Sequence, residues 1–183
     1  MRRRRLLAIF VALLVGGGIA AGKSEALRAL DRIGAATLSS DAVVHELLTT
    51  GEVRDALVER FGDDEQRKWL EGLLWPRVGE RMAAWREEQE HADPRPRAAV
   101  VEVPLLFESG MEAAFDKTIA IVADEGTRSE RAGARGHRGV ESRTSRQLGQ
   151  DEKARRADVV VRNDGSLDDL ERALSSALAT MEP

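Results

Sequence analysis

The sequence lacks cysteine and tyrosine entirely, and aromatic residues make up only 4% of its 183 positions. Without cysteine the chain can form no disulfide, no thiolate metal site and no cysteine nucleophile, which fits a reducing, cytoplasmic setting. So few aromatic side chains disfavour a base-stacking platform for single-stranded nucleic acid. The net charge of -4 likewise disfavours general nucleic-acid binding, so we expect no nucleic-acid partner.

A long apolar run is also missing. Arg2 to Arg5 followed by Leu6 to Val15 imitate the start of a secretory signal. The apolar part is shorter than the ~20 residues that a membrane-spanning helix needs. We interpret it as a buried strand behind a solvated arginine tail and expect no membrane partner. A signal peptide or a membrane tether stays open as the alternative.

The segment after this run satisfies the pattern G-x-x-x-x-G-K-[ST] in full, as Gly17-Gly18-Ile19-Ala20-Ala21-Gly22-Lys23-Ser24. Glycines let successive backbone N–H groups face an anion, and a following helix adds its positive end. Lys23 is predicted to reach the β- and γ-phosphates of ATP, and Ser24 to offer a hydroxyl ligand to Mg²⁺. The alternative is a glycine-rich turn that happens to contain Lys-Ser. Only ATP and Mg²⁺ are implied as cofactors.

Short β-rich runs alternate with helical stretches along the chain, which predicts an α/β fold with a mostly parallel sheet flanked by helices. The predicted strands are Leu7–Val15, Ala35–Leu38, Ala98–Phe107, Lys117–Ala123 and Asp158–Val161. The predicted helices are Ser24–Ile33, Ala42–Leu48, Glu52–Phe61, Gln66–Gln89 with a break at Pro76, and Leu167–Met181. Together with the phosphate loop, this order predicts a P-loop NTPase-type fold.

Two helical subregions interrupt this pattern without breaking the chain into domains. Residues 42–92 are predicted to form the first, a mostly helical region. Residues 126–156 are arginine-rich, contain five glycines and lack the apolar content for a core, so we predict a helical, mobile excursion. We therefore expect one domain, 1–183, acting as a monomer, with weak oligomers as the alternative.

Asp41 follows the second predicted strand and lies where a small-molecule kinase of this fold meets its acceptor. A carboxylate there can accept the proton of a hydroxyl nucleophile. The alternative is a simple helix N-cap, at Ser40 or Asp41. His45 lies one turn later on the same face and is predicted to line the same site, the alternative being a partly buried helix residue.

Four segments in order carry a resemblance to a known family: the phosphate loop, Ser40-Asp41-Ala42-Val43-Val44-His45-Glu46-Leu47, Val103-Pro104-Leu105-Leu106-Phe107-Glu108, and Ala157-Asp158-Val159-Val160-Val161-Arg162-Asn163-Asp164-Gly165. Together they resemble dephospho-coenzyme A kinase over nearly the whole chain. The resemblance implies transfer of the ATP γ-phosphoryl group to the ribose 3′-hydroxyl of dephospho-coenzyme A. The alternatives are another small-molecule or nucleoside-monophosphate kinase, or a non-catalytic ATP-binding module.

The resemblance also implies that residues 42–92 bind the acceptor, that residues 126–156 form a lid, and that particular residues have roles in the reaction. Asp41 becomes the catalytic carboxylate, and Arg143 becomes a catalytic lid arginine, with a solvated surface as the alternative for the lid. Arg135, Asn163 and Gly165 are implied on the nucleotide side, although Asn163 to Gly165 fit an ordinary turn equally well. The implied acceptor-pocket residues, most of which also fit a core strand, are Glu102, Pro104, Leu105 and Leu106.

The chain also departs from the family pattern. Trp75-Pro76 stands where a His-Pro pair is usual, and the stretch between residues 61 and 68 looks shortened. These departures put acceptor binding in doubt more than ATP binding.

Overall fold

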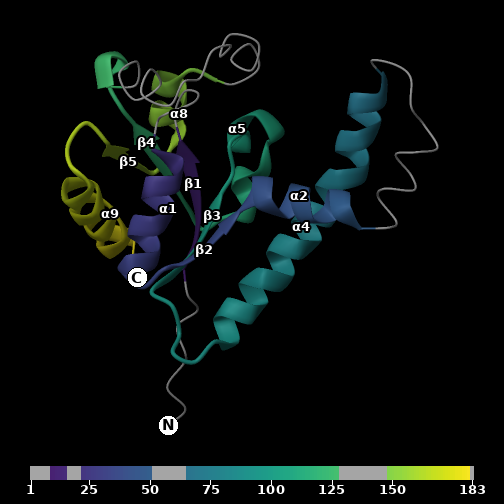
Figure 1. Ribbon diagram of the computed structural model, residues 1–183, viewed down its shortest axis with the longest axis horizontal. Coiled ribbons are helices and arrows are strands. Elements are labelled where there is room, and N and C mark those ends of the chain that lie inside the picture. The colour runs from purple at the N-terminus through teal and green to yellow at the C-terminus, as the bar shows by residue number, and fades with distance from the viewer. Residues whose placement is uncertain (1–8, 16–21, 51–64, 128–147, 182–183) are drawn as a thin grey trace.

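A five-stranded, all-parallel sheet forms the centre of the computed structural model, which describes residues 9–15, 22–50, 65–127 and 148–181 (Figure 1). The strand order is β2-β3-β1-β4-β5, which places β1 in the middle, paired with β3 and β4. The parallel sheet predicted from the sequence is thereby confirmed. The strands are β1 (Ile9–Val15), β2 (Ala36–Ser39), β3 (Ala98–Glu102), β4 (Lys117–Val122) and β5 (Val159–Arg162).

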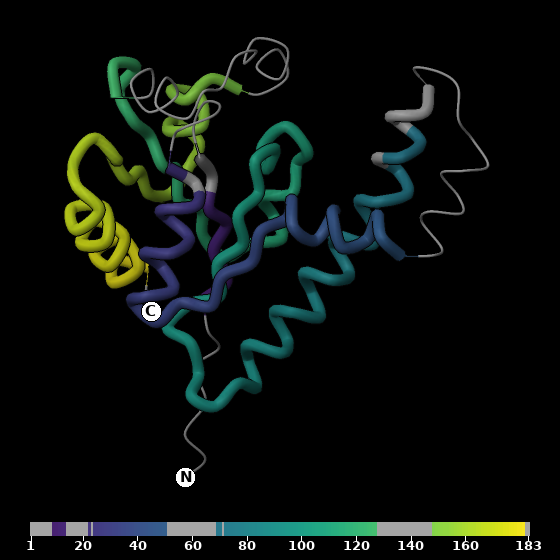
Figure 2. Tube along the Cα trace, in the orientation of Figure 1, coloured from purple at the N-terminus to yellow at the C-terminus, as the bar shows by residue number. Residues whose placement is uncertain are grey.

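Helices cover both faces of the sheet (Figures 1 and 2). One face packs against α1 (Lys23–Arg32) and α9 (Leu167–Met181). The other packs against α2 (Ser40–Thr49), α4 (Glu65–His91) and the short α5 (Leu106–Ser109). The 3₁₀ turn η1 (Met111–Ala114) follows α5, and α8 (Gln150–Arg156) lies beside β4.

The sequence of β1 is continuously apolar because the strand is buried on both faces of the sheet. Val11 and Leu13 face the core under α1 and α9, whereas Phe10 and Ala12 face the core under α2 and α4. All four side chains are at most 3% exposed. A strand buried on both faces has no place for alternating polar residues.

α9 matches its predicted bounds because both its start and its apolar stripe are local features. The Ser166 N–H donates to Asp169 Oδ2 at 3.0 Å, and the Asp169 N–H donates back to Ser166 Oγ at 3.2 Å. This reciprocal pairing satisfies N–H groups that the first helical turn leaves unpaired. Five apolar side chains on one face then enter the core: Leu170, Leu174, Ala177, Leu178 and Met181.

The predicted break at Pro76 is wrong, because α4 runs through this residue from Glu65 to His91. Pro76 removes the N–H that would bond to the Gly72 carbonyl, but Arg77 Nη1 donates to the next carbonyl, that of Leu73, at 2.9 Å. Figure 1 shows the helix changing direction part-way along its length. A buried stripe continues on both sides of the proline and holds the helix together: Leu74, Val78, Met82 and Trp85.

The predicted strand Ala98–Phe107 is too long. β3 ends at Glu102, and residues Leu106–Ser109 form α5 instead. Pro104 has no N–H to continue a strand ladder. The Ser109 N–H donates to the Leu105 carbonyl at 3.0 Å and its hydroxyl to the same carbonyl at 2.7 Å, which closes a helical turn.

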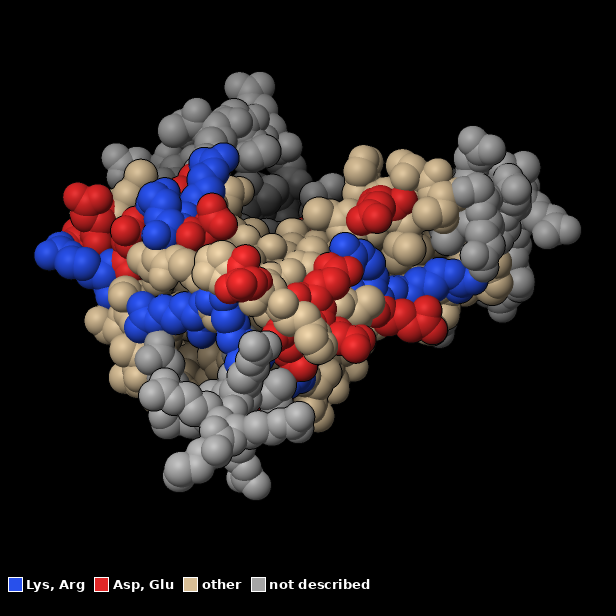
Figure 3. Space-filling view, turned by 90° about the horizontal axis from the view of Figure 1, so that it is seen from below, with Lys and Arg blue, Asp and Glu red and all other residues tan. Residues whose placement is uncertain are grey.

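The predicted helix Glu52–Phe61 and the arginine tail lie outside the described residues. In the part of the chain that the structure describes, no helix combines the length and apolar character needed to cross a membrane. Viewed from below, where the strands begin, the surface shows acidic and basic side chains interspersed (Figure 3).

Candidate active site

The end of the predicted phosphate loop forms the start of α1. Gly22 is the N-cap, with φ of 95° and ψ of 23°, and its carbonyl accepts the Ala26 N–H at 2.8 Å. Lys23 is the first helical residue, and Ser24 follows with an exposed side chain. The N-terminus of α1 presents N–H groups and the positive end of the helix dipole, which favour an anion. Gly17, Gly18, Ile19, Ala20 and Ala21 lie outside the described residues.

Asn163 lies directly against this loop. Its side chain is 4% exposed, and a β-carbon added to Gly22 would lie only 2.1 Å from Asn163 Nδ2. The Asn163 N–H donates to the Val122 carbonyl at 2.8 Å, which ties the end of β5 to β4. The structure thus brings Asn163 to the phosphate loop, as a residue packed on its backbone. A contact with the adenine base stays a prediction.

The turn after Asn163 is bonded to the end of β4. Asp164 Oδ1 accepts the Asp124 N–H at 2.7 Å, while Gly165 is exposed beside the α9 cap. Asp124 in turn accepts the Thr127 hydroxyl at 2.6 Å and the Thr127 N–H at 2.8 Å. The hydroxyl bond, followed by the N–H bond, lowers the pKa of Asp124 below its ordinary value. Sequence reasoning missed Asp124, whose signal was its place directly after an apolar strand.

Asp41 and His45 both lie on α2 with exposed side chains, one turn apart. The helix begins at Ser40, and Ser39 is its N-cap, without a side-chain capping bond. The N-cap interpretation of Ser40 or Asp41 is therefore wrong, as is the partly buried interpretation of His45. Asp41 remains a carboxylate in the first turn of a helix that follows β2 directly.

Glu102 ends β3 and is fully buried. Its Oε2 accepts the Ser39 hydroxyl at 2.9 Å, across the register pair that joins β2 to β3. On its other side Glu102 is in register with Leu13 of β1. A carboxylate in this position needs hydrogen bonds to offset its lost hydration. Ser39 was not singled out from the sequence, because a serine at the end of a strand is a common turn residue.

The other predicted acceptor residues differ in their burial. Pro104 and Leu105 are half-buried in the turn after β3, whereas Leu106 is 0% exposed and packs in the core under α2 and α4. The core interpretation therefore describes Leu106. Pro104 and Leu105 retain exposed surface at the edge where Glu102 ends its strand.

The predicted lid is described only at its two ends. Arg135 and Arg143 lie outside the described residues. After residue 147 the chain is anchored to the sheet, because the Leu148 N–H donates to Glu108 Oε1 at 2.7 Å and Gln150 Oε1 accepts the Ala123 N–H at 3.0 Å. Leu148 to Arg156 thus belong to the folded body, although we had expected this stretch to lack core contacts.

A phosphate loop between a central strand and its helix, in a parallel sheet of order β2-β3-β1-β4-β5 with carboxylates at the ends of neighbouring strands, defines a P-loop kinase. The sequence model of the dephospho-CoA kinase family matches residues 47–169. The chain belongs to the dephospho-CoA kinase family.

Individual relatives agree with this assignment. A dephospho-CoA kinase from Symbiobacterium thermophilum is 36% identical over 83% of this chain and 73% of its own length. One from Deinococcus radiodurans is 35% identical over 91% of this chain and 90% of its own. The crystal structure of a Thermus thermophilus protein is 31% identical and superposes with a TM-score of 0.70, covering 96% of this chain and all of that one.

Proposed function

We propose that this protein transfers the γ-phosphoryl group of ATP to the ribose 3′-hydroxyl of dephospho-coenzyme A, giving coenzyme A and ADP. Membership of the family supports the reaction and its substrates. The observation that favours an active enzyme is the arrangement at the carboxyl ends of β1, β2 and β3. There Gly22 caps the N-terminus of α1, which favours a phosphate, while Asp41 has an exposed carboxylate.

On the ATP side, the backbone of residues 17–22 and the ammonium of Lys23 bind the phosphates in this proposal. Asn163 supports the loop from behind, because its side chain fills the space beside Gly22. Gly165 lies in the same turn, on the side that we assign to the adenine. Arg135 is assigned to the nucleotide as well.

Ser24 fits a Mg²⁺ ion, because it presents an exposed hydroxyl at the start of α1. Mg²⁺ takes hard oxygen ligands and in kinases is shared with substrate phosphates. We assign Ser24 as the protein ligand. The ion, when bound, neutralises charge on the β- and γ-phosphates.

On the acceptor side, Asp41 accepts the proton of the 3′-hydroxyl and orients its oxygen for in-line attack. The bond from the 3′-oxygen to the γ-phosphorus forms as the bond from that phosphorus to the β–γ bridging oxygen breaks, and ADP leaves. His45, Pro104 and Leu105 line the acceptor, and Glu102 holds the β2 end through Ser39. Leu106 contributes from within the core.

In this proposal residues 42–92 form the acceptor-binding region and residues 126–156 form the lid, both within a single domain. Residues 148–156 are the part of the lid that is anchored to the rest of the fold. Arg143 is assigned to the lid's catalytic role. A guanidinium there stabilises the negative charge that a metaphosphate-like transition state spreads over its oxygens.

The direct test measures ADP release from Mg²⁺–ATP, with and without dephospho-coenzyme A, and identifies the product by co-migration with authentic coenzyme A. Asp41→Asn should lower kcat by about 10²–10⁴-fold, since it removes the general base. Asp31→Asn is the matched control, because Asp31 is an exposed aspartate on α1, outside the proposed acceptor-binding region. It should keep the wild-type rate.

Two results would contradict the proposal. If ATP binds but dephospho-coenzyme A does not increase ADP release, only an ATP-binding module would remain. A faster response to adenosine or to a nucleoside monophosphate would assign the site to another small-molecule kinase.

A further inference from the structure

Lys153 of α8 is fully buried, at 0% exposure. Its Nζ donates to the Pro104 carbonyl at 2.6 Å and lies 3.3 Å from Glu108 Oε1. Removing an ammonium from water is costly unless hydrogen bonds and an opposite charge offset the loss. Both are present here, so the position of this side chain is closely specified.

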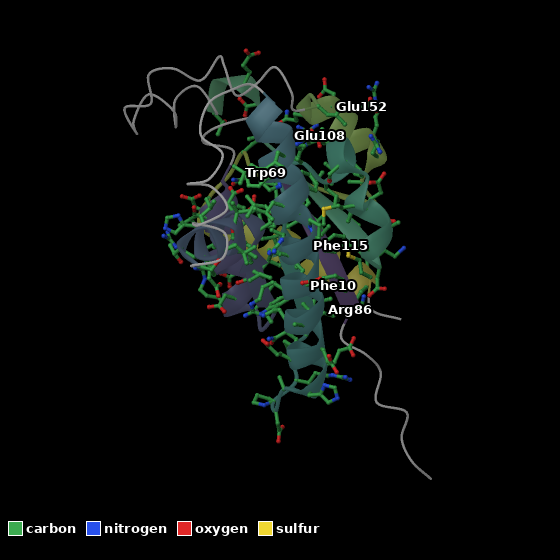
Figure 4. The ribbon with its side chains drawn as sticks, turned by 90° about the vertical axis from the view of Figure 1, so that its right-hand side faces the viewer. Phe10, Trp69, Arg86, Glu108, Phe115 and Glu152 are labelled. Atoms are coloured by element: carbon green, nitrogen blue, oxygen red, sulfur yellow. The ribbon has the colours of Figure 1, made fainter. Side chains whose placement is uncertain are left out.

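Glu108 connects the lysine to a second segment. Its Oε1 also accepts the Leu148 N–H at 2.7 Å, while its Oε2 is buried and has no hydrogen-bond partner among the described residues. One carboxylate oxygen therefore contacts both Lys153 of α8 and Leu148, two residues before that helix begins. Figure 4 shows Glu108 at the upper end of the molecule, near the carboxyl ends of the strands. The pair thus lies at the edge where we place the acceptor.

The Pro104 carbonyl is the informative contact. Pro104 starts the turn between β3 and α5, where its half-buried ring and the half-buried Leu105 side chain retain exposed surface. Glu102, two residues earlier, is held by Ser39. Ser39 therefore holds the end of β3, and Lys153 holds the turn that follows it.

Arg156 offers a comparison on the same helix. Its guanidinium lies 4.3 Å from the centre of the Phe107 ring, and Nη2 is 2.9 Å from Glu112 Oε1. It thus joins α8 to the α5–η1 segment, as Lys153 does, but its side chain is 37% exposed and has no recorded bond to the turn at Pro104 in the described structure. Arg156 docks the helix, whereas Lys153 reaches the turn itself.

We propose that Lys153 is a positioning residue for the acceptor, acting through the Pro104 carbonyl to hold the turn after β3 in its binding geometry. Glu108 is its charge partner and makes the buried ammonium tolerable. The proposal rests on the function proposed above, because it assigns this turn to dephospho-coenzyme A.

The test compares full-length variants in steady-state kinetics with each substrate varied in turn. Lys153→Met should raise the KM for dephospho-coenzyme A about tenfold, as expected for loss of one hydrogen bond from a charged donor, and leave the KM for ATP within about twofold. Arg156→Met is the matched control. It should lower the thermal midpoint slightly and leave both KM values within about twofold of the wild type.

A double variant separates positioning from folding. Lys153→Met alone leaves the Glu108 carboxylate buried without its partner, which can prevent folding. Glu108→Gln/Lys153→Met removes both charges and keeps an acceptor for the Leu148 N–H, so its thermal midpoint should recover relative to the single variant. The raised KM for dephospho-coenzyme A should persist, because the Pro104 carbonyl still lacks its donor.

Each contrary result has a distinct meaning. An acceptor KM that returns to the wild-type value in the double variant would reduce Lys153 to a charge partner of Glu108. An equal rise in Arg156→Met would assign the effect to docking of α8 as a whole. If the wild type itself does not respond to dephospho-coenzyme A, the proposed function fails and this inference fails with it.

Discussion

A pair of stacked aromatic rings lies at the amino ends of the strands, whereas polar side chains lie at their carboxyl ends. Phe10 at the start of β1 stacks on Phe115 just before β4, with ring centroids 4.6 Å apart, and the Arg86 guanidinium lies 4.7 Å above the Phe10 ring. Figure 4 shows these three side chains together, well below Glu108. At the other end lie Glu102 and Lys153, both fully buried.

The two ends of the strands therefore have different roles: the amino ends stabilise the fold, and the carboxyl ends carry the candidate site. At the aromatic end, ring stacking and a cation–π contact join β1 to α4 and to Phe115, just before β4. The polar end has exposed Ser24 and Asp41 as well as the buried Glu102 carboxylate, and open parallel sheets generally bind ligands there. Substitutions at the two ends should therefore affect different measurements.

Phe10→Ala should have the largest effect on stability. The side chain is 3% exposed, so truncation should cost about 3–5 kcal/mol in free energy of unfolding, measured by urea titration. The KM values of the folded fraction should not change. Trp75→Ala is the control, since Trp75 is 36% exposed on α4 and its loss should cost less than about 1 kcal/mol. Equal losses at the two sites would mean that the aromatic end does not stabilise the sheet.

The two ends of α1 permit a sharper comparison. Gly22 and Gly34 both have positive φ, 95° and 87°, but a β-carbon would meet Asn163 at Gly22 and nothing within 4 Å at Gly34. Gly34→Ala should therefore cost only the backbone strain, about 1 kcal/mol, and leave the KM for ATP unchanged. Gly22→Ala should add a rise of about tenfold or more in that KM, because the loop or Asn163 must move. A similar KM in both variants would contradict the packing role of Asn163.

The smallest effect is expected from a carboxylate at the aromatic end. Asp158 Oδ2 accepts the Thr118 hydroxyl at 2.7 Å and N–H at 2.9 Å. Burial raises the pKa of Asp158, but the Thr118 bonds and the Lys117 charge outweigh it, so the pKa falls below 3.8. A lowered pKa contributes stability that is present above the unfolded value and is lost as the pH falls through the folded value.

Asp158→Asn should accordingly remove up to about 1 kcal/mol near neutral pH, given that the side chain is 42% exposed, and less once the pH falls through the lowered pKa of Asp158. Unfolding titrations across this range measure the difference. Glu87→Gln, at an exposed site on α4, is the control. A stability difference between Asp158→Asn and wild type that stays constant with pH would show that the carboxylate's charge is irrelevant there.

Local signals in the sequence were sufficient for most of the fold. β1 followed from an apolar run before a phosphate loop, and α9 from its amphipathic pattern. Two local signals misled, for opposite reasons. Pro76 did not end α4, because packing onto the sheet continues beyond it, and the apolar run after Glu102 was not strand, because Pro104 cannot extend the ladder.

The candidate site was predictable only where a motif or the family resemblance marked it. Gly22, Asp41 and Asn163 belong to recognisable segments. Lys153 lies in a charged stretch in which nothing distinguishes it from its solvated neighbours, since its burial depends on Pro104 and Glu108 from an earlier part of the chain. Contacts between residues so far apart in sequence leave no local pattern.

The central position of β1 has a consequence for how the chain folds. β1 pairs with β3 from residue 98 and with β4 from residue 117, so its partners are made long after it during synthesis. Until about two thirds of the chain has emerged, the first strand is an apolar segment with at least one edge uncovered. Non-local parallel pairing of this kind slows folding, because loop-closure entropy is lost before any contact forms. We therefore expect the nucleotide site to assemble late in folding.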